Sequence, residues 1–512
     1  MPKNKIIVLS DIHISTNEPT NWYQKDFHEP YLSAILDYVI RESDSIQELI
    51  LLGDIFDSWT YPPDRQPPTF TDFLNANPNI FGVDGKLNQA LTALQGKVTY
   101  VNGNHDMEIA EHDLHQIPNS SNYQIKYSPD PIYYVQTAGG KKIAFTHGHI
   151  FTMFNAPCAD TEISPLPLGY FITRSVAYML NKKLQPGQTV ADLPGQGAPN
   201  SINLEGLVSL VMPLISSVNA ANFSGSLGLV NLVLDYIRQE TGIPEDEPII
   251  LPNGQTTTMA QAKEVYHNLE KKWVSDCGGG TDGISAMGKS AIADLNGTYI
   301  AWFAQQSALI SDSDLIVLGH THTPKLDITN GFVKYANNGF ECPSSLDIPP
   351  QGVTFSVVDT DNCQASIYQV IKQNTSYQIS PYSALRDSVI FSAISMDYSC
   401  YVTIDNSNGT STLNLTQSND EHGHYVVSPP QQIIPGQKIK FWLQDYAGPV
   451  GSEGSVTYSG GGRSMTFTYA CPFTGLNNCS GANFYTCNDG ANWGKLNKTK
   501  YLGHPFFVKF VL

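Results

Sequence analysis

The chain has 512 residues and carries 29 Lys and Arg against 47 Asp and Glu, so its formal net charge is −18 at pH 7. That excess of negative charge argues against a binder of long nucleic acid, because affinity for a phosphate backbone depends on Lys and Arg. Charged residues make up only 15% of the chain, compared with about 25% in an average soluble protein, and the length is sufficient for two to four domains.

The amino-terminal segment does not have the pattern of a secretory signal. Its apolar run, IIVL in MPKNKIIVLSDIH, is much shorter than the roughly 7–15 residues that such a signal needs. The most apolar later stretch, 204–218, contains Glu205 and Pro213 and is shorter than the roughly 20 residues of a membrane-spanning helix. We therefore expect a protein that is cytoplasmic or is released without a recognisable signal peptide.

Short apolar runs recur along the first part of the chain, and each ends in a polar cluster. Their content of Ile, Val, Leu, Phe and Tyr predicts buried strands at 5–9, 48–52, 97–101, 141–146 and 315–318. The clusters that follow them read SDIH, GDIFD, GNHD, THGH and GHTH. Helical spacing at 30–42 and 86–94 places helices between these strands, which indicates an α/β core with its ligands beyond the carboxyl ends of the strands.

The pattern between 151 and 314 is helical and interrupted by Pro and Gly. Apolar residues three and four apart predict helices at 171–184, 205–218, 227–240 and 259–273. We interpret the region from about 155 to 312 as a helical insertion. It lies between the fourth and fifth of the predicted strands, so it could cover their carboxyl ends as a lid.

Strands resume after the insertion, and the composition then changes again. Strands are predicted at 332–335, 353–358 and 365–371, followed by a polar stretch, 372–380, that is typical of a linker. From 388 onward Gly, Ser, Asn and Thr dominate, and short strands recur at 401–405, 438–443, 455–458, 464–469 and 506–511. This spacing favours a β-sandwich. We therefore divide the chain into an α/β domain at 1–375 and an all-β domain at 386–512.

The cysteines leave two alternatives open. None of the eight forms a C-x-x-C pair, so zinc-finger spacing is absent. Cys400, Cys471, Cys479 and Cys487 could form two disulfides in any of about three connectivities. Alternatively they are free thiols, as in a reducing cytosol.

The polar clusters together supply oxygen and nitrogen donors without a thiolate: Asp11, His13, Asp54, Asn104, His147, His320 and His322. Such donors suit Mn, Fe, Co or Zn in a hydrolytic site better than a structural zinc site. Residues two apart share one face of a strand, so Asp11/His13 and His320/His322 are each expected to present two donors to one place. The set is too large for one tetrahedral ion and suits two ions that share the carboxylate of Asp54. His149 competes with His147, which we favour because it follows its strand directly.

The ordered motifs D-x-H, G-D-x-x-D, G-N-H-D, H-G and G-H-x-H resemble the signature of calcineurin-like metallophosphoesterases. The resemblance covers roughly the first 370 residues apart from the insertion. It implies a four-layer αββα sandwich that holds two divalent metal ions, with Mn favoured. It also implies a ligand set for each ion: Asp11, His13, Asp54 and His322 for one, and Asp54, Asn104, His147 and His320 for the other.

That resemblance also implies a mechanism. Two neighbouring cations lower the pKa of a bridging water, and the resulting hydroxide attacks the phosphorus of a phosphate ester. His105 is the candidate to protonate the leaving group, with Asp106 orienting its ring. Asp57 is expected to hydrogen-bond a metal ligand rather than to touch metal. A general acid favours phosphodiesters, while phosphomonoesters and nucleotide diesters remain alternative substrates.

The apolar side chains of the insertion allow two interpretations, and one of them concerns the chemical class of the substrate. An apolar lid would suit a lipid-like or small organic phosphate ester. Alternatively, its apolar residues form an ordinary core of their own. The residues concerned are Phe171, Tyr178, Met179, Leu180, Val208, Met212, Leu214, Leu229 and Leu232.

The carboxyl-terminal region resembles aegerolysins, small β-sandwich proteins that recognise membrane lipids. The similar stretches are VVSPPQQIIPGQKIKF at 426–441 and GSEGSVTY at 451–458. The resemblance implies a membrane lipid as a possible partner, and the alternative is a sandwich that positions substrate or forms dimers; the sequence leaves the oligomeric state open. A rival function is a lipid-binding or toxin-like interaction protein with a spent phosphoesterase scaffold, which the intact set of donors opposes.

Overall fold

A computed structural model describes most of the chain. The described residues are 3–119, 121–158, 161–163, 165–193, 204–216, 225–296, 299–326, 332–339, 353–382, 385–386, 398–445, 450–487, 494 and 504–512. They form two compact units. The first unit comprises 1–300, 315–326 and 336–385, and the second, which we call the sandwich unit, comprises 301–314, 327–335 and 386–512.

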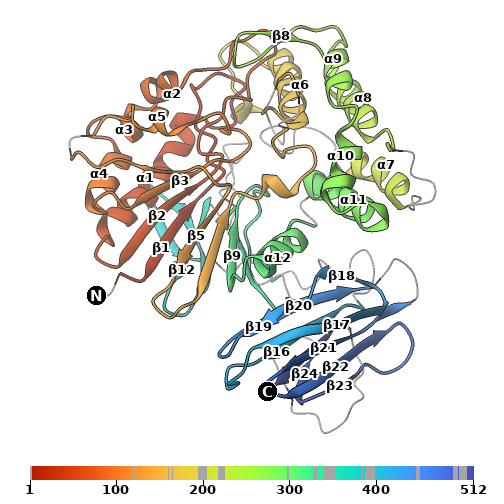
Figure 1. Cartoon of the computed structure of the whole chain (residues 1–512). Coiled ribbons are helices and arrows are strands. Elements are labelled where there is room, and N and C mark those ends of the chain that lie inside the picture. Colours follow the sequence, from red (N-terminus) through yellow and green to blue (C-terminus); the bar gives the residue numbers. More distant parts are fainter. Residues whose placement is uncertain are drawn as a thin grey trace. The chain divides into compact units, whose positions relative to one another are not determined.

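The first unit is built on two β-sheets, one of which lies against helices (Figure 1). Over the described residues, the larger sheet has seven strands in the order β14-β13-β12-β1-β2-β3-β4. β1, β2, β3 and β4 run parallel, and β12 pairs with β1 in the antiparallel sense. Their bounds are β1 Lys5–Leu9, β2 Ile46–Leu52, β3 Val98–Val101, β4 Lys126–Ser128, β12 Val353–Asp359, β13 Gln364–Gln373 and β14 Ser376–Pro381.

The second sheet of this unit has six strands within the described ranges, in the order β15-β10-β11-β9-β6-β5. Their bounds are β5 Ile132–Gln136, β6 Lys142–Thr146, β9 Leu315–Leu318, β10 Lys325–Leu326, β11 Lys334–Asn337 and β15 Leu385–Arg386. Ile6, Val8 and Ile50 of the larger sheet share one apolar core with Phe145 and Val317 of this sheet. The two sheets are therefore packed face to face, and the predicted mixed α/β layout is confirmed.

Helices cover the opposite face of the larger sheet. Ile7 and Leu9 point away from the second sheet and pack with Leu32 and Ile35 of α1, because successive side chains of a strand point to opposite faces. The helices that follow the first strands are α1 Lys25–Arg41, α2 Phe70–Ala76, α3 Pro78–Phe81, α4 Lys86–Ala93 and α5 Glu111–Leu114. α1 begins five residues before the predicted start at 30, since Pro30 is accommodated inside the helix.

The insertion is helical, as predicted, and has its own core (Figure 1). Its helices are α6 Leu168–Lys183, α7 Leu204–Ser216, α8 Leu229–Thr241, α9 Met259–Val265, α10 Leu269–Asp276 and α11 Gly280–Asn296, with a short hairpin formed by β7 Ile249–Ile250 and β8 Thr256–Thr257. The single helix predicted at 259–273 is in fact two, because the chain leaves the helix between Val265 and Leu269.

Most of the apolar side chains considered for a lid are used inside the insertion. Phe171 and Leu229 are fully buried in its core, and Leu214 and Leu232 pack against that core. Met179 and Leu180 form a smaller buried cluster with Val190. The side chains of Val208 and Met212 lie outside the described residues. The alternative of an ordinary core therefore applies to those of these side chains that the structure describes.

The stretch predicted as a linker, 372–380, is instead part of a hairpin. β13 and β14 pair in the antiparallel sense, with Gln373 opposite Ser376. Asn374 turns the chain with φ 56°, a conformation that Asn adopts more readily than most residues. Tyr377 and Ile379 alternate along β14 and pack against the helix-side core, a period-two pattern that the polar neighbours conceal.

The sandwich unit consists of two five-stranded sheets, counted over the described residues. One contains β16 Cys400–Asp405, β18 His424–Val427, β20 Lys438–Gln444, β24 Asn483–Cys487 and β25 Phe506–Val511, and the other β17 Leu413–His422, β19 Gln432–Ile433, β21 Gly451–Gly460, β22 Arg463–Pro472 and β23 Asn478–Ser480. Val402 and Phe441 of the first meet Val456 and Phe467 of the second in one core. The predicted β-sandwich is confirmed.

Part of α12 Ile300–Ile310 belongs to the sandwich unit. The Trp302 indole donates a hydrogen bond to Gln444 (3.0 Å) and packs edge-on against Trp442.

Cys479 is a buried free thiol, so the arrangement with two disulfides among four cysteines is not present. Within the described part of the chain, no helix is both long and apolar enough to cross a membrane.

Candidate metal centre

The predicted donors come together at the carboxyl ends of strands from both sheets of the first unit. Asp11 and His13 follow β1, Asp54 follows β2 and Asn104 follows β3, whereas His147 follows β6 and His320 and His322 follow β9. Asp11, His13 and His147 have no solvent-exposed surface, and Asp54 is only 1% exposed. The structure thus places the seven residues together at one centre, in which His320 is only partly buried.

The paired donors reach this centre by a different geometry from the one predicted. Strand alternation does not apply, because β1 ends at Leu9 and β9 ends at Leu318. The donors sit in loops, and their φ angles are positive: Asp11 56°, His13 57°, Asp54 52°, His320 71° and His322 55°. Non-glycine residues rarely adopt this left-handed conformation, and clusters of them occur at functional sites.

Glycines in the same motifs allow close approach of the backbone to the carboxylates. A Cβ added at Gly103 would lie 2.1 Å from Oδ1 of Asp54, and one at Gly319 would lie 2.6 Å from Oδ2 of Asp11. Neither position has room for a side chain. The same carboxylates accept backbone hydrogen bonds at 2.8 Å, Asp54 from His105 and Asp11 from His320, so the glycine motifs position the carboxylates directly.

One cluster consists of Asp11, His13 and His322, whose ligand atoms lie within 4.8 Å of one another. His13 Nδ1 lies 3.2 Å from Oδ2 of Asp57 and donates its hydrogen to this carboxylate. The other ring nitrogen, Nε2, then carries a lone pair that can bind a cation. That Nε2 faces Nε2 of His322 at 3.2 Å, and the latter is 3.5 Å from Oδ1 of Asp11. Two imidazole nitrogens and a carboxylate oxygen that face one another fit a cation between them.

The second cluster consists of Asp54, His147 and His320. His147 Nδ1 lies 3.0 Å from the Leu52 carbonyl, to which it can only donate, so Nε2 is the atom left for a metal ion, and it lies 3.1 Å from Oδ2 of Asp54. The side-chain oxygen of Asn104 is 3.1 Å from Nδ1 of His320. These contacts again bring acceptor atoms together, which a positive charge would stabilise.

The pKa values of the side chains in the two clusters also indicate that a cation would be stabilised there. Burial opposes ionisation of Asp54, but the imidazoles of His147 and His105 outweigh it and hold the pKa of Asp54 well below its usual value. Burial likewise disfavours charge on His147, yet the Asp54 carboxylate raises the pKa of His147 to about 9. For His320 and His322, burial and neighbouring imidazoles hold the pKa well below its usual value. Ionised Asp54 and neutral His320 and His322 are in the protonation states that metal ligation requires, whereas His147, with its raised pKa, would have to lose a proton when a cation binds.

The competing His149 lies on the short 3₁₀ turn His149–Phe151. Its ring centroid is 5.5 Å from that of His147, and burial together with His147 lowers the pKa of His149 to about 3. It belongs to neither of the two clusters described above.

Asp57 lies between the first cluster, which it contacts at His13, and His105. Its Oδ1 lies 3.0 Å from Nδ1 of His105, and its Oδ2 is the contact of His13 described above. Burial opposes ionisation of Asp57, but His105 and His13 outweigh it and lower the pKa. Asp57 thus contacts His13, one of the predicted ligands, and it also orients His105.

Asp106 does not have the orienting role that we expected from its position beside His105. Its carboxylate accepts hydrogen bonds from the backbone amides of Ile55 (2.8 Å) and Gly103 (2.6 Å) and from the Tyr100 hydroxyl (2.5 Å). Adjacent residues in a loop point in different directions, and here Asp106 turns inward. It ties the loop that carries Asn104 to the loop that carries Asp54.

Two tryptophans at the centre were not identified from the sequence. Trp22 packs its ring against His13 (4.9 Å between centroids) and His105 (5.2 Å). Trp59 stacks on His105 with centroids 4.3 Å apart. Trp59 follows Asp57 by two residues, but no spacing rule links such a residue to the site, so only the structure reveals these contacts.

A comparison with protein families decides the class of this centre. Residues 4–173 match the family described as calcineurin-like phosphoesterase. The chain contains a calcineurin-like metallophosphoesterase domain. The matched segment carries Asp11, His13, Asp54, Asn104 and His147, and His320 and His322 join them from beyond it. This metallophosphoesterase domain makes the protein a phosphoric ester hydrolase, and its paired His/Asp clusters suit a dinuclear site for divalent metal ions.

Two solved structures show remote likeness to the chain. A dimetal phosphatase from Danio rerio is 12% identical with a TM-score of 0.27, over 75% of this chain and 100% of its own. The lipid-binding protein Nakanori is 11% identical with a TM-score of 0.18, over 24% of this chain and 74% of its own. At these TM-scores neither likeness carries a further conclusion. No curated protein matches the sequence.

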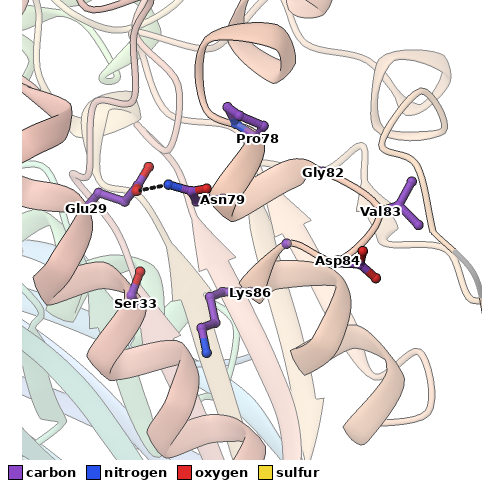
Figure 2. Close-up of a pocket in the computed structure, with 9 residues that line it drawn as sticks. Glu29, Ser33, Pro78, Asn79, Gly82, Val83, Asp84 and Lys86 are labelled. Carbon is purple, nitrogen blue, oxygen red and sulfur yellow. Dashed lines mark hydrogen bonds between the residues drawn. The ribbon is translucent and has the colours of Figure 1, made fainter.

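A separate pocket of about 570 Å³ lies among the helices of the metallophosphoesterase domain, as Figure 2 shows. It is lined by residues of α1, α3 and α4, including Glu29, Asn79 and Lys86. Asn79 donates a hydrogen bond to Glu29 at 2.7 Å, and the other carboxylate oxygen of Glu29 is shielded from solvent. None of the predicted metal-binding or catalytic residues lines this pocket.

Proposed function

We propose that the protein is a phosphodiesterase whose substrate is a small organic or lipid-like phosphate diester. The observation that supports this is the position of His105, whose Nδ1 is held by Asp57 beside the two metal-binding clusters. A protonated imidazole there can donate a proton to the departing alkoxide. That step matters more for diesters with poor leaving groups than for activated esters.

The chain's own residues have distinct roles in this proposal. Asp11, His13, Asp54 and His322 would hold one divalent ion, and Asp54, Asn104, His147 and His320 the other, with Mn favoured. When bound, the ions supply a nucleophilic water at neutral pH and neutralise charge on phosphate oxygens. Asp57 holds His105 by its Nδ1, which leaves the other ring nitrogen to give up the proton. Trp22 and Trp59 limit access of bulk water to that ring.

Hydrolysis of bis-p-nitrophenyl phosphate tests the proposal, measured with and without added Mn²⁺ and beside p-nitrophenyl phosphate. We expect Mn²⁺-dependent turnover of the diester. Asp54→Ala should abolish activity on both esters, and His105→Ala should slow diesters with poor leaving groups by about 100-fold or more. Faster hydrolysis of the monoester would favour the phosphomonoesterase alternative, and a preference for nucleotide diesters would favour a nucleotide phosphodiesterase.

Lipid binding by the sandwich unit is the second candidate function. Val450, Phe473 and Leu476 are 44%, 40% and 37% exposed. Gly451 pairs with Pro472 at the ends of β21 and β22, so Val450 and Phe473 extend from neighbouring strand ends. Exposed apolar side chains grouped at loop tips are a feature of surfaces that contact lipid. The rival function, a lipid-binding protein with an inactive phosphoesterase scaffold, predicts that the chain binds lipid and has no phosphoesterase activity.

Liposome flotation of the full chain tests lipid binding, with phosphatidylcholine vesicles that contain or lack an anionic lipid. We expect binding that is reduced by the double substitution Phe473→Ser and Leu476→Ser. Ile434→Ser is the matched control, because Ile434 is 52% exposed elsewhere in the same unit. Equal loss in both variants, or flotation with neither vesicle, contradicts a role for this group of residues.

A further inference from the structure

The loop after Asp57, residues 59–65, lies between His105 and the helical insertion. At its start, the fully buried indole of Trp59 stacks on the imidazole of His105, with an interplanar angle of 27°. The Trp59 backbone amide also donates to Oδ1 of Asp57 at 2.8 Å. Trp59 therefore contacts both the ring of His105 and the carboxylate that orients this ring.

The insertion contacts the other side of this loop. Tyr170, on α6, packs its ring edge-on against Trp59 with centroids 5.8 Å apart. Its hydroxyl donates to the Ile250 carbonyl at 2.8 Å. Trp59 belongs to the same apolar core as the insertion residues, although it lies about a hundred residues before them in the sequence. The ring of Tyr170 is therefore fixed at one end by Trp59 and at the other by the insertion.

Arg174, one turn further along α6, holds the rest of the loop. Its side chain is fully buried, and its Nη2 donates to the carbonyls of Pro62 (2.9 Å), Pro63 (3.1 Å) and Arg65 (2.6 Å). Among the described residues, no carboxylate forms an ion pair with it. Burial of a guanidinium costs several kcal/mol unless its donors are used. Here the donors of Nη2 fix the backbone of the loop that carries Trp59, whereas Nε and Nη1 are buried without a hydrogen-bond partner among the described residues.

We propose that the insertion is a positioning element for His105, in which Tyr170 and Arg174 hold Trp59 and Trp59 holds the imidazole. The inference rests on the proposed role of His105 as proton donor. Asp57 fixes one ring atom of His105, which by itself permits the ring to tilt about that contact. The indole stacked on its face fixes the ring plane. A displacement of about 1 Å in a reacting group can lower a rate by about 100-fold.

The test compares two tyrosines of the same insertion core. Tyr170 and Tyr266 are both fully buried, and each donates its hydroxyl to a backbone carbonyl, but of the two only Tyr170 contacts Trp59. For Tyr170→Leu and Tyr266→Leu we measure kcat on a diphenyl and on a bis-p-nitrophenyl phosphate diester with Mn²⁺-loaded protein. We expect Tyr170→Leu to lower the ratio of the phenyl to the nitrophenyl rate about tenfold. Tyr266→Leu should leave that ratio unchanged.

A double-mutant cycle separates positioning from general loosening. When His105 is already replaced by Ala, Tyr170→Leu should have no further effect on the ratio, because the group that it positions is gone. Arg174→Lys provides a milder variant if Tyr170→Leu does not fold, and it should move the ratio in the same direction. An unchanged ratio in a folded Tyr170→Leu or Arg174→Lys protein overturns the proposal, as does an equal further loss in the His105→Ala background.

A crystal structure of Tyr170→Leu distinguishes failure of the inference from failure of the proposed function. If His105→Ala itself leaves the ratio unchanged, His105 is not the proton donor, and the kinetic test reports on the function alone. In that case the crystal structure of Tyr170→Leu shows whether the insertion positions the His105 ring. A changed angle between the His105 ring and the Trp59 indole, which is 27° here, in Tyr170→Leu, with an unchanged angle in Tyr266→Leu, supports the inference, and an unmoved His105 ring in both refutes it.

Discussion

Five of the seven predicted metal-binding residues have a backbone conformation that non-glycine residues rarely adopt. Positions of this kind cost of order 1–3 kcal/mol each for most side chains and less for Asp and His. The neighbouring glycines make these conformations useful, because they let one loop pass directly against the carboxylate of another. At the residue scale, the site therefore depends on glycines as much as on the ligands themselves.

Gly103→Ala tests this dependence. The added Cβ would lie 2.1 Å from Oδ1 and 2.5 Å from the backbone nitrogen of Asp54, so the Asp54 carboxylate must move. We expect phosphoesterase activity to fall at least about 100-fold and the metal content measured by plasma mass spectrometry to decrease. Gly139→Ala is the control, because its Cβ would meet only Oγ1 of Thr137 at 3.8 Å. Normal metal content in Gly103→Ala would contradict this account.

Asp57→Asn is a second test at the residue scale. The substitution keeps the size of the side chain but removes the charge that faces both His13 and His105. Residues that hydrogen-bond a metal ligand typically contribute about 10–100-fold to metal affinity or activity. We expect a loss of that size in affinity for Mn²⁺, measured by calorimetric titration. Unaltered affinity would show that Asp57 serves His105 alone.

At the scale of elements, the insertion helix α8 begins without a side-chain cap of its own. Gly228 precedes it in a left-handed conformation, and the cap comes from another helix. Glu270 of α10, which is 1% exposed, accepts a hydrogen bond from the Leu229 amide at 2.7 Å and also bonds the Leu227 amide. A carboxylate at a helix amino terminus satisfies free amides and interacts favourably with the helix dipole.

Glu270→Ala should therefore destabilise the insertion by about 1–3 kcal/mol, because buried amides of α8 lose their acceptor. Urea denaturation followed by circular dichroism measures the change in the free energy of unfolding. Glu264→Ala, at an exposed position of α9, is the matched control and should change stability by less than about 0.5 kcal/mol. Similar stability of the two variants would show that the cap contributes little.

At the scale of the whole molecule, the negative net charge and the buried centre act together. The centre places Asp11, Asp54 and Asp57 in an environment almost without solvent, inside a chain whose formal charge is already −18. Bound cations relieve this concentration of negative charge. They bind the folded state and so stabilise it by mass action.

Removal of metal should consequently lower the melting temperature. We expect EDTA treatment to shift the calorimetric transition downward by several degrees and added Mn²⁺ to restore it, since a ligand at about 100 times its Kd contributes roughly 2.7 kcal/mol. His320→Ala should reduce the Mn²⁺-dependent shift because it removes a ligand of the second cluster. A transition that does not respond to EDTA or Mn²⁺ would contradict a metal centre in the folded protein.

The sequence by itself determined several of the strands, the order of the motifs and the donor side chains that meet at the centre. β1 and β9 have the predicted bounds, because buried parallel strands are continuous apolar runs and their polar ends are sharp. Only the tertiary structure decided the left-handed loops, the orientation of His105 by Asp57 instead of Asp106, the core of the insertion and the stack of Trp59 on His105. These features depend on contacts between residues far apart in the chain and on the direction in which each loop side chain points. Local spacing specifies neither of them.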